Sequence, residues 1–289
     1  MSRTDLALEL AEQIPADRFP PQEFSTRVVS RGPVRLTFMR VSGERAAREI
    51  GRPCGRYVTA EIPPLTDTVS SLLPAAEILG AALRGLLPPT GTVLVVGLGN
   101  GAITPDALGP QCVRHVLATR HIRGEYARVA GLSDLRPVAT VESGVMGSTG
   151  LESGELTRGI VQVIDPVAVI AVDALAARSL HRLGCTVQMS DSGIVPGSGV
   201  GNSRKALDRE LLRVPVISLG VPTVVDAGTL AEELTGRACP ETAPRGAQMM
   251  VTPREVDLLV RRAAKLLAMT INAALQPRYD ADELTEAAD

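Results

Sequence analysis

The chain has 289 residues, 45% of them hydrophobic and 21% charged, which is an ordinary balance for a soluble globular protein with a large core. Its formal net charge of −2 and its aromatic content of 2%, without any Trp, argue against direct binding to nucleic acid or to a membrane surface. Four scattered cysteines without a C-x-x-C pair, an N-terminus unlike a signal peptide and no apolar run of about 18 residues predict a cytoplasmic protein without a spanning helix.

The first part of the chain is mixed in character, with a strand-like run, VRLTFMRV, at residues 34–41. Residues 73–87 are predicted to form a helix that ends at the following Pro-Pro pair. From residue 92 onward, short β-branched runs alternate with segments of helical periodicity. We expect strands at 92–96, 167–172, 185–190 and 214–219, and helical segments at 111–119, 155–164, 174–183 and 253–275.

Strands that alternate with helices are typical of a parallel sheet wound on both faces. The wholly apolar run VAVIAV at 167–172 supports this, because strands of such sheets are buried on both sides. We therefore predict an α/β protein with a mostly parallel sheet flanked by helices on both faces, as a single domain over residues 1–289. The acidic end, residues 278–289, is expected to be a frayed tail.

Aspartates follow four of the predicted strands, and in open parallel sheets the functional crevice lies outside the carboxyl ends of the strands. Clustered carboxylates repel one another and separate their pKa values, which suits acid–base work on water. Capping of a helix N-terminus is the ordinary alternative for each of them. Two observations weaken the capping alternative: the run before Asp173 is wholly apolar, and an aspartate follows each of four predicted strands. These aspartates are Asp106, Asp173, Asp191 and Asp226.

The glycine-rich stretch GLGNGA, residues 97–102, fits the dinucleotide-binding pattern G-x-G-x-x-G/A. A working fingerprint needs a helix that begins within the glycines and an acid about 20 residues further on. Here Thr104 and Pro105 form a later candidate helix start, and residues 117–123 contain no acid. We therefore interpret the glycines as a tight turn that presents Asp106. The second glycine loop, residues 196–202, fits no phosphate-binding pattern and is favoured as the edge of a site.

Other chemistries find little support in the sequence. The three histidines show no metal-binding spacing, and His121 with Glu125 is at most a weak pair. There is no G-x-S-x-G elbow and no cysteine with an evident His partner in the sequence. We expect neither a metal nor a cofactor.

Five motifs, in this order, carry a family resemblance: VVGLGNGAITPDALGP, GVMGSTGLESGELTRGIV, AVDALAARSL, SDSGIVPGSGVGN and GVPTVVDA. From residue 3 to about 227 the chain resembles the spore germination proteases of endospore-forming bacteria. The resemblance implies a homotetrameric endopeptidase of the spore core that degrades small acid-soluble spore proteins. It also implies a zymogen with an N-terminal propeptide, and a three-layer α/β sandwich similar to hydrogenase-maturation endopeptidases.

By motif, the resemblance makes Asp106 and Asp173 the catalytic pair. One carboxylate would take a proton from water, and the other would polarise the peptide carbonyl or protonate the leaving nitrogen. The sequence leaves the two roles open, although a place near a helix N-terminus favours Asp106 as the base. The candidates for substrate binding or support are Asp191, Asn100 and Gly199.

The N-terminal stretch TDLALE, residues 4–9, is similar to the stretches that this family cuts in its substrates. It predicts self-cleavage between Glu9 and Leu10, with residues 1–9 as the propeptide; the simpler alternative is the start of an amphipathic helix. The chain departs from the family pattern at Gly101 and Ala102, where bulkier residues are usual, and at Ser143, where proline is usual. The alternatives to an aspartate-based endopeptidase are a non-catalytic oligomer that binds the same proteins, a metal-assisted peptidase on the same fold and a nucleotide-dependent oxidoreductase.

Overall fold

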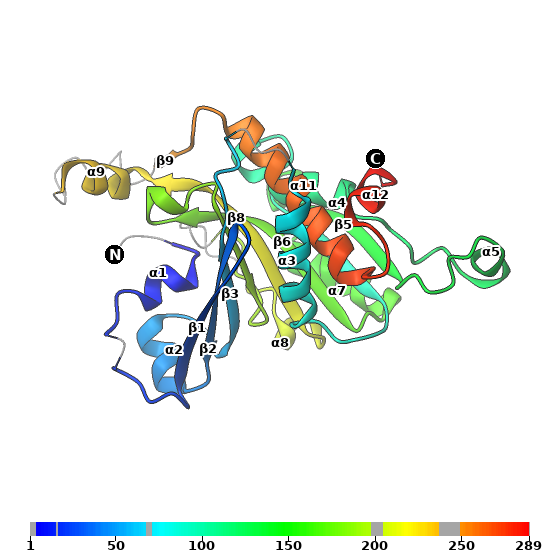
Figure 1. The fold of residues 1–289 in the computed structure, drawn as a ribbon, viewed down its shortest axis with the longest axis horizontal. Helices are drawn as coiled ribbons and strands as arrows, with labels where there is room; N and C mark the ends of the chain where they lie inside the picture. Colours follow the sequence, from blue (N-terminus) through cyan, green and yellow to red (C-terminus); the bar gives the residue numbers. More distant parts are fainter. Residues whose placement is uncertain (1–3, 16, 68–70, 198–204, 237–248, 289) are drawn as a thin grey trace.

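A computed structural model of the chain describes residues 4–15, 17–67, 71–197, 205–236 and 249–288 (Figure 1). A nine-stranded sheet has the order β1-β2-β3-β7-β8-β6-β4-β5, with β9 paired to β8. The strands are β1 Phe24–Arg31, β2 Val34–Val41, β3 Gly55–Glu61, β4 Val93–Leu98, β5 Val138–Gly144, β6 Ala168–Ala177, β7 Thr186–Ser190, β8 Val216–Asp226 and β9 Met250–Val251. The helical segments are α1 Ala7–Ala11, α2 Glu44–Ile50, α3 Leu73–Arg84, η1 Thr104–Asp106, α4 Leu108–Arg114, α5 Gly124–Val129, α6 Met146–Thr149, α7 Ser153–Ile164, η2 Leu180–Arg182, α8 Arg209–Leu212, α9 Ala227–Thr235, α11 Val256–Leu275 and α12 Ala281–Glu286.

The α/β class is confirmed, and the sheet is mixed. Strands β5, β4, β6 and β8 pair in parallel, whereas β8, β7, β3, β2 and β1 pair antiparallel. The antiparallel part was missed except for the predicted strands at 34–41 and 185–190. Most residues of β1 are exposed, so its sequence has little apolar alternation to reveal it.

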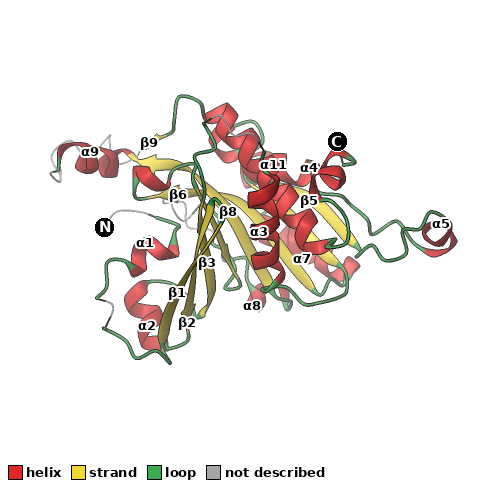
Figure 2. Cartoon of the chain, in the orientation of Figure 1, coloured by secondary structure: helices red, strands yellow, loops and turns green. Residues whose placement is uncertain are grey.

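Helices cover both faces of the parallel part, which gives three layers (Figure 2). Alternate residues of β4 divide between the two cores, since side chains along a strand point to opposite faces. Val93 and Val95 pack with α3, α4 and α11, whereas Leu94 and Val96 pack with α7 and α8. Both faces of β4 are therefore buried, and this explains the uninterrupted apolar run.

The predicted helix at 174–183 is wrong, because β6 continues through Ala177. Residues 174–177 read ALAA, which favours a helix by intrinsic propensity. Parallel pairing with the long strand β8 overrides that propensity: the register continues to Ala177 opposite Val225. Only the short segment η2 remains helical, and Gly184 follows it with a φ of +68°.

The predicted frayed tail at 278–289 is also wrong over the residues that the structure describes. Helix α12 begins at the cap Asp280, whose carboxylate accepts hydrogen bonds from the amides of Asp282 (2.8 Å) and Glu283 (3.1 Å). The side-chain amide of Asn272 in α11 donates to the hydroxyl of Thr285 at 2.9 Å, and Leu284 is buried. A cap, a buried polar contact and apolar burial together hold this acidic segment.

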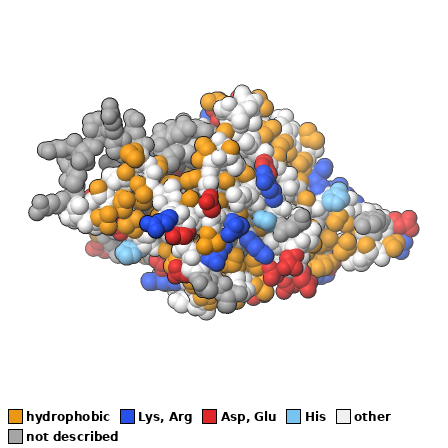
Figure 3. All heavy atoms as spheres, turned by 90° about the horizontal axis from the view of Figure 1, so that it is seen from above, with side chains coloured by type: hydrophobic (Ala, Val, Ile, Leu, Met, Phe, Trp, Pro, Cys, Tyr) orange, Lys and Arg blue, Asp and Glu red, His pale blue; other side chains and the backbone are white. Residues whose placement is uncertain are grey.

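Helices α5 and α9 lie at opposite ends of the long axis (Figure 1). On the face shown in Figure 3, acidic, basic and hydrophobic side chains are interspersed, and neither sign of charge covers it. No helix in the described ranges is both long enough and apolar enough to cross a membrane.

The cysteines differ in burial, and this gives a first prediction. Cys54 is exposed, whereas burial raises the pKa of the Cys112 thiol, so that Cys112 holds less of the reactive thiolate at about pH 8. We expect iodoacetamide to modify Cys54 in the native protein and to spare Cys112 until denaturant is added, as followed by peptide mass spectrometry. Equal labelling of both in the native state would contradict this burial.

Candidate active site

One pocket brings together aspartates from three separate parts of the chain. Asp106 enters it from η1, Asp173 from β6 and Asp5 from the N-terminal segment. Thr223 of β8 and Ile103 also line it. The sequence-predicted pair, Asp106 and Asp173, thus shares a pocket, and Asp5 joins it without having been predicted.

Glycines in and after the GLGNG stretch allow the two chain segments beside this pocket to touch. Gly99 has a φ of +105°, and a side chain there would overlap the carbonyl oxygen of Asp106. A side chain on Gly109 would overlap the backbone of Leu98 at the end of β4. The glycines therefore serve a close backbone approach that sets the position of Asp106.

The carboxylate of Asp106 is fixed by the same loop. The amide of Asn100 donates to its Oδ2 at 2.7 Å, and the side-chain oxygen of Asn100 accepts the amide of Ala102 at 3.0 Å. Segment η1 is tied to β8, because the buried hydroxyl of Thr223 donates to the carbonyl of Pro105 at 2.7 Å. Asn100 thus acts on Asp106 through its backbone, and its own side chain closes the turn.

The dinucleotide interpretation does not fit this geometry. Helix α4 begins at Leu108, well after the glycines, and not within the glycine motif as a dinucleotide fingerprint requires. The loop amide of Asn100 is occupied by a carboxylate of the chain itself. The expected helix start at Thr104 is a 3₁₀ turn whose N-cap is Ile103, without a side-chain cap.

Asp173 does not follow its strand, as we expected, but sits inside β6. It is 5% exposed and lies opposite Gly220 of β8. Its Oδ1 accepts the amide of Ala174 at 2.9 Å. Pairing of β6 with β4 ends at Val172, so Asp173 lies just beyond that ladder and is held by its pairing with β8. A firmly held carboxylate suits acid–base chemistry.

The expectation that four aspartates gather at one rim is wrong for two of them. Strand β7 runs antiparallel to β8, so Asp191 leaves the sheet at a different level from Asp173. Both of its carboxylate oxygens bind Arg56, through the amide (2.6 Å) and Nε (2.7 Å). Asp226 caps α9. Gly199 lies outside the described residues.

The N-terminal segment runs along β6 from this pocket. The amide of Asp5 donates to the carbonyl of Ala176 (2.9 Å), and the amide of Ala176 donates to Oδ2 of Asp5 (2.8 Å). Gln188 of β7 donates to the carbonyl of Asp5 (2.8 Å) and accepts the amide of Ala7 (2.6 Å). The sequence held no signal for Gln188, which contacts residues more than 180 positions away.

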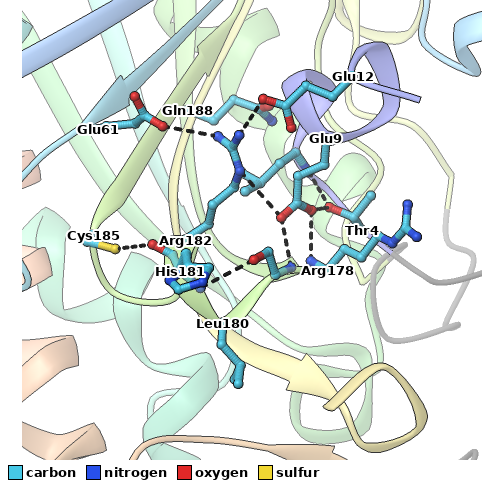
Figure 4. A network of polar contacts seen from close by, with 12 residues as sticks. Thr4, Glu9, Glu12, Glu61, Arg178, Leu180, His181, Arg182, Cys185 and Gln188 are labelled. Atoms are coloured by element: carbon cyan, nitrogen blue, oxygen red, sulfur yellow. Dashed lines mark hydrogen bonds and ion pairs between the residues drawn. The ribbon is translucent and has the colours of Figure 1, made fainter. Parts of the chain in front are cut away.

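Glu9 lines a second pocket, which contains none of these aspartates, and Figure 4 shows its polar contacts. It is 4% exposed, and its two oxygens accept the amides of Arg178 (2.7 Å) and Ser179 (2.9 Å). The hydroxyl of Thr4 donates to the same carboxylate. The Glu9–Leu10 bond lies within α1. Asp5 lines the pocket of Asp106 and Asp173, whereas Glu9 does not.

Across the described ranges, no three His, Cys, Asp or Glu side chains form a group suited to holding a metal ion. The predicted weak pair of His121 and Glu125 is therefore not part of a larger ligand set within those ranges. The pocket of Asp106 and Asp173 likewise contains no such group among the residues that the structure describes.

Comparisons with known proteins identify similar proteins over nearly the whole chain. The family model described as germination protease matches residues 20–236. The germination protease of Caldanaerobacter subterraneus subsp. tengcongensis is 38% identical, over 98% of this chain and 97% of that protein. Those of Clostridium perfringens (35%; 98% of both chains) and Priestia megaterium (34%; 96% of this chain and 94% of that protein) are also similar. A crystal structure of the NiFe hydrogenase maturation protease HycI from Thermococcus kodakarensis aligns with a TM-score of 0.38 and 16% identity, over 66% of this chain and 99% of that one.

An α/β chain that aligns over almost its whole length with proteases is itself a peptidase. More particularly, the chain belongs to the germination protease family.

Proposed function

We propose that this peptidase is a zymogenic endopeptidase of the spore core that begins the degradation of small acid-soluble spore proteins during germination. The single observation behind the proposal is the pocket that Asp106 and Asp173 share, with the chain's own N-terminal segment entering it. A segment of the same chain bound beside paired carboxylates is what a self-inhibited protease requires.

In the proposed mechanism, one carboxylate accepts a proton as the water oxygen attacks the peptide carbonyl carbon. The other carboxyl group polarises the carbonyl and then protonates the leaving nitrogen, so that the C–N bond breaks and a carboxylate and an amine result. Asp106 is half-buried, whereas Asp173 is 5% exposed. Water reaches Asp106 more readily, and we assign Asp106 as the base and Asp173 as the acid.

We further propose that residues 1–9 contain the propeptide. The TDLALE stretch points to cleavage between Glu9 and Leu10, whereas the pocket has Asp5 beside the two aspartates. The Asp5–Leu6 bond is thus a second candidate. Cleavage at either bond requires the N-terminal segment to be held in a fixed position. Two hydrogen bonds between Asp5 and Ala176 hold it along β6.

Intact-mass spectrometry after acidification tests the processing. We expect loss of either residues 1–9 or residues 1–5, and the two losses differ by four residues in mass. The Asp173→Asn variant serves as the control and should keep its N-terminus, because it lacks one of the two proposed catalytic carboxylates. Cleavage by a contaminating protease would instead shorten both proteins alike. An N-terminus that stays intact under every activating condition would speak against a zymogen.

Incubation with a purified small acid-soluble spore protein tests the activity itself. Cleavage that persists with a chelator supports attack of water assisted by the two aspartates alone, and chelator-sensitive cleavage supports the metal-assisted variant. Binding without cleavage would identify an inert oligomeric binder instead. Light scattering on the same sample measures the oligomeric state, for which we propose a tetramer.

A further inference from the structure

We propose that the pocket now occupied by Glu9 is a recognition site for an acidic side chain of the substrate. That side chain would lie four residues after the substrate residue that faces Asp106 and Asp173. The inference rests on the proposed function and adds a specificity determinant to it. We refer to the amides of Arg178 and Ser179 together with the guanidinium of Arg182 as the Glu9 pocket.

The Glu9 pocket is built by the body of the protein. The amides of Arg178 and Ser179 belong to the short connection between β6 and η2, where neither a strand ladder nor a helix uses them. They point at the two oxygens of one carboxylate, at 2.7 and 2.9 Å. Converging backbone amides of this kind form a preformed site for an anion.

Arg182 supplies the positive charge of the Glu9 pocket (Figure 4). Its side chain is 12% exposed, and its Nε lies 3.7 Å from Oε1 of Glu9. It also reaches Glu12 at 2.6 Å and Glu61 at 3.8 Å. Its buried Nη1 makes no hydrogen bond within the described part of the chain. Glu12 already pairs with this largely buried cation, so the two converging amides carry most of the preference for an acidic occupant, and Arg182 adds to it.

A continuous track joins the Glu9 pocket to the aspartate pair. Leu6 is fully buried against Leu175, Ala177 and Ile194, just beyond Asp5. Gln188 binds only the backbone of this segment, and Ala176 binds the backbone and the carboxylate of Asp5. A substrate peptide that follows the same path, with an acidic residue in place of Asp5, could make the same contacts. A substrate in this track would present its fourth residue after the aspartate pair to the Glu9 pocket.

The competing explanation is a structural one, in which the Glu9 pocket only ties α1 to the body of the protein. The two explanations differ in one measurable respect. A recognition site accepts an acidic side chain from a separate peptide and distinguishes it from the neutral isostere. A structural tie does neither.

The test uses the full-length Glu9→Gln variant, in which the chain's own occupant is weakened. A labelled peptide with the sequence of residues 3–13 is titrated by fluorescence anisotropy, beside a matched peptide that carries Gln at the position of Glu9. We expect the acidic peptide to bind at least about tenfold more tightly, because hydrogen bonds to a charged group are strong. Adding Arg182→Gln should reduce that preference at least about threefold, and Arg182→Lys should restore part of it.

Equal binding of the two peptides, binding of neither, or an unchanged preference in the Arg182→Gln variant would overturn the proposal. Thermal unfolding of each variant establishes that it is folded. The result is separable from the proposed function. Cleavage of spore proteins with equal peptide binding removes only this inference, whereas a clear preference without any cleavage removes only the protease mechanism.

Discussion

Replacing Asp106 or Asp173 by asparagine should each lower kcat by about 10²- to 10⁴-fold, the range typical for loss of a general acid or base. Asparagine has nearly the same shape as aspartate, but it can neither accept nor deliver the proton. The amide of Asn100 can still donate to the side-chain oxygen of Asn at position 106, so the loop should keep its geometry. The measurement is the rate of cleavage of an acid-soluble spore protein at saturating substrate.

Asp226→Asn is the matched control for this pair. Asp226 is the last residue of β8; it caps α9 and is absent from the shared pocket. Asparagine caps a helix as well as aspartate does, so this variant should keep both its activity and its thermal stability. Undiminished cleavage by both the Asp106 and the Asp173 variants would overturn the assignment of the catalytic pair.

The largest effect on stability is expected at Gly99. The change Gly99→Ala places a side chain at a φ of +105° and against the carbonyl of Asp106. Strain and overpacking each cost about 1–3 kcal/mol, so the free energy of unfolding should fall by several kcal/mol. Displacing Asp106 by about 1 Å would also cost about 10²-fold in activity.

Gly101→Ala, two positions further along the same loop, is the control for Gly99→Ala. A side chain at Gly101 would meet its nearest neighbour, Pro110, at 3.6 Å, which is ordinary contact. We expect its free energy of unfolding to change by less than about 0.5 kcal/mol in urea titrations. Similar losses in both variants would show that the close approach at Gly99 is not the cause.

The parallel half of the fold was predictable because a strand that is buried on both faces appears in the sequence as an uninterrupted apolar run. The apolar runs of β4 and β6 both belong to fully covered strands, and motif resemblance added Asp106 and Asp173. The extent of β6 was not predictable, since ALAA favours a helix until β8 is beside it. Pairing partners outweigh local preference where a strand lies in the middle of a sheet.

The N-terminal contacts lay beyond sequence reasoning for a different reason. Asp5 meets Ala176, and Glu9 meets Arg178 and Ser179, about 170 residues away along the chain. Glu9 is bound mainly by backbone amides, and every residue type except proline has one, so the sequence does not indicate such a site. Asp191 is the opposite case: it follows a strand, as the sequence indicated, but the antiparallel direction of β7 places it beside Arg56 and outside the pocket of Asp106 and Asp173.

The position of Glu9 gives the two candidate processing bonds opposite outcomes. A tethered group meets its pocket at an effective concentration in the millimolar range, so a free substrate at lower concentration competes poorly. A cut at Glu9–Leu10 turns the occupant into a free peptide that dilutes away. A cut at Asp5–Leu6 leaves Glu9 attached to the chain through residues 10–23, and the tethered competitor persists after processing. In the first case activity follows the cut at once; in the second it waits for a separate release step.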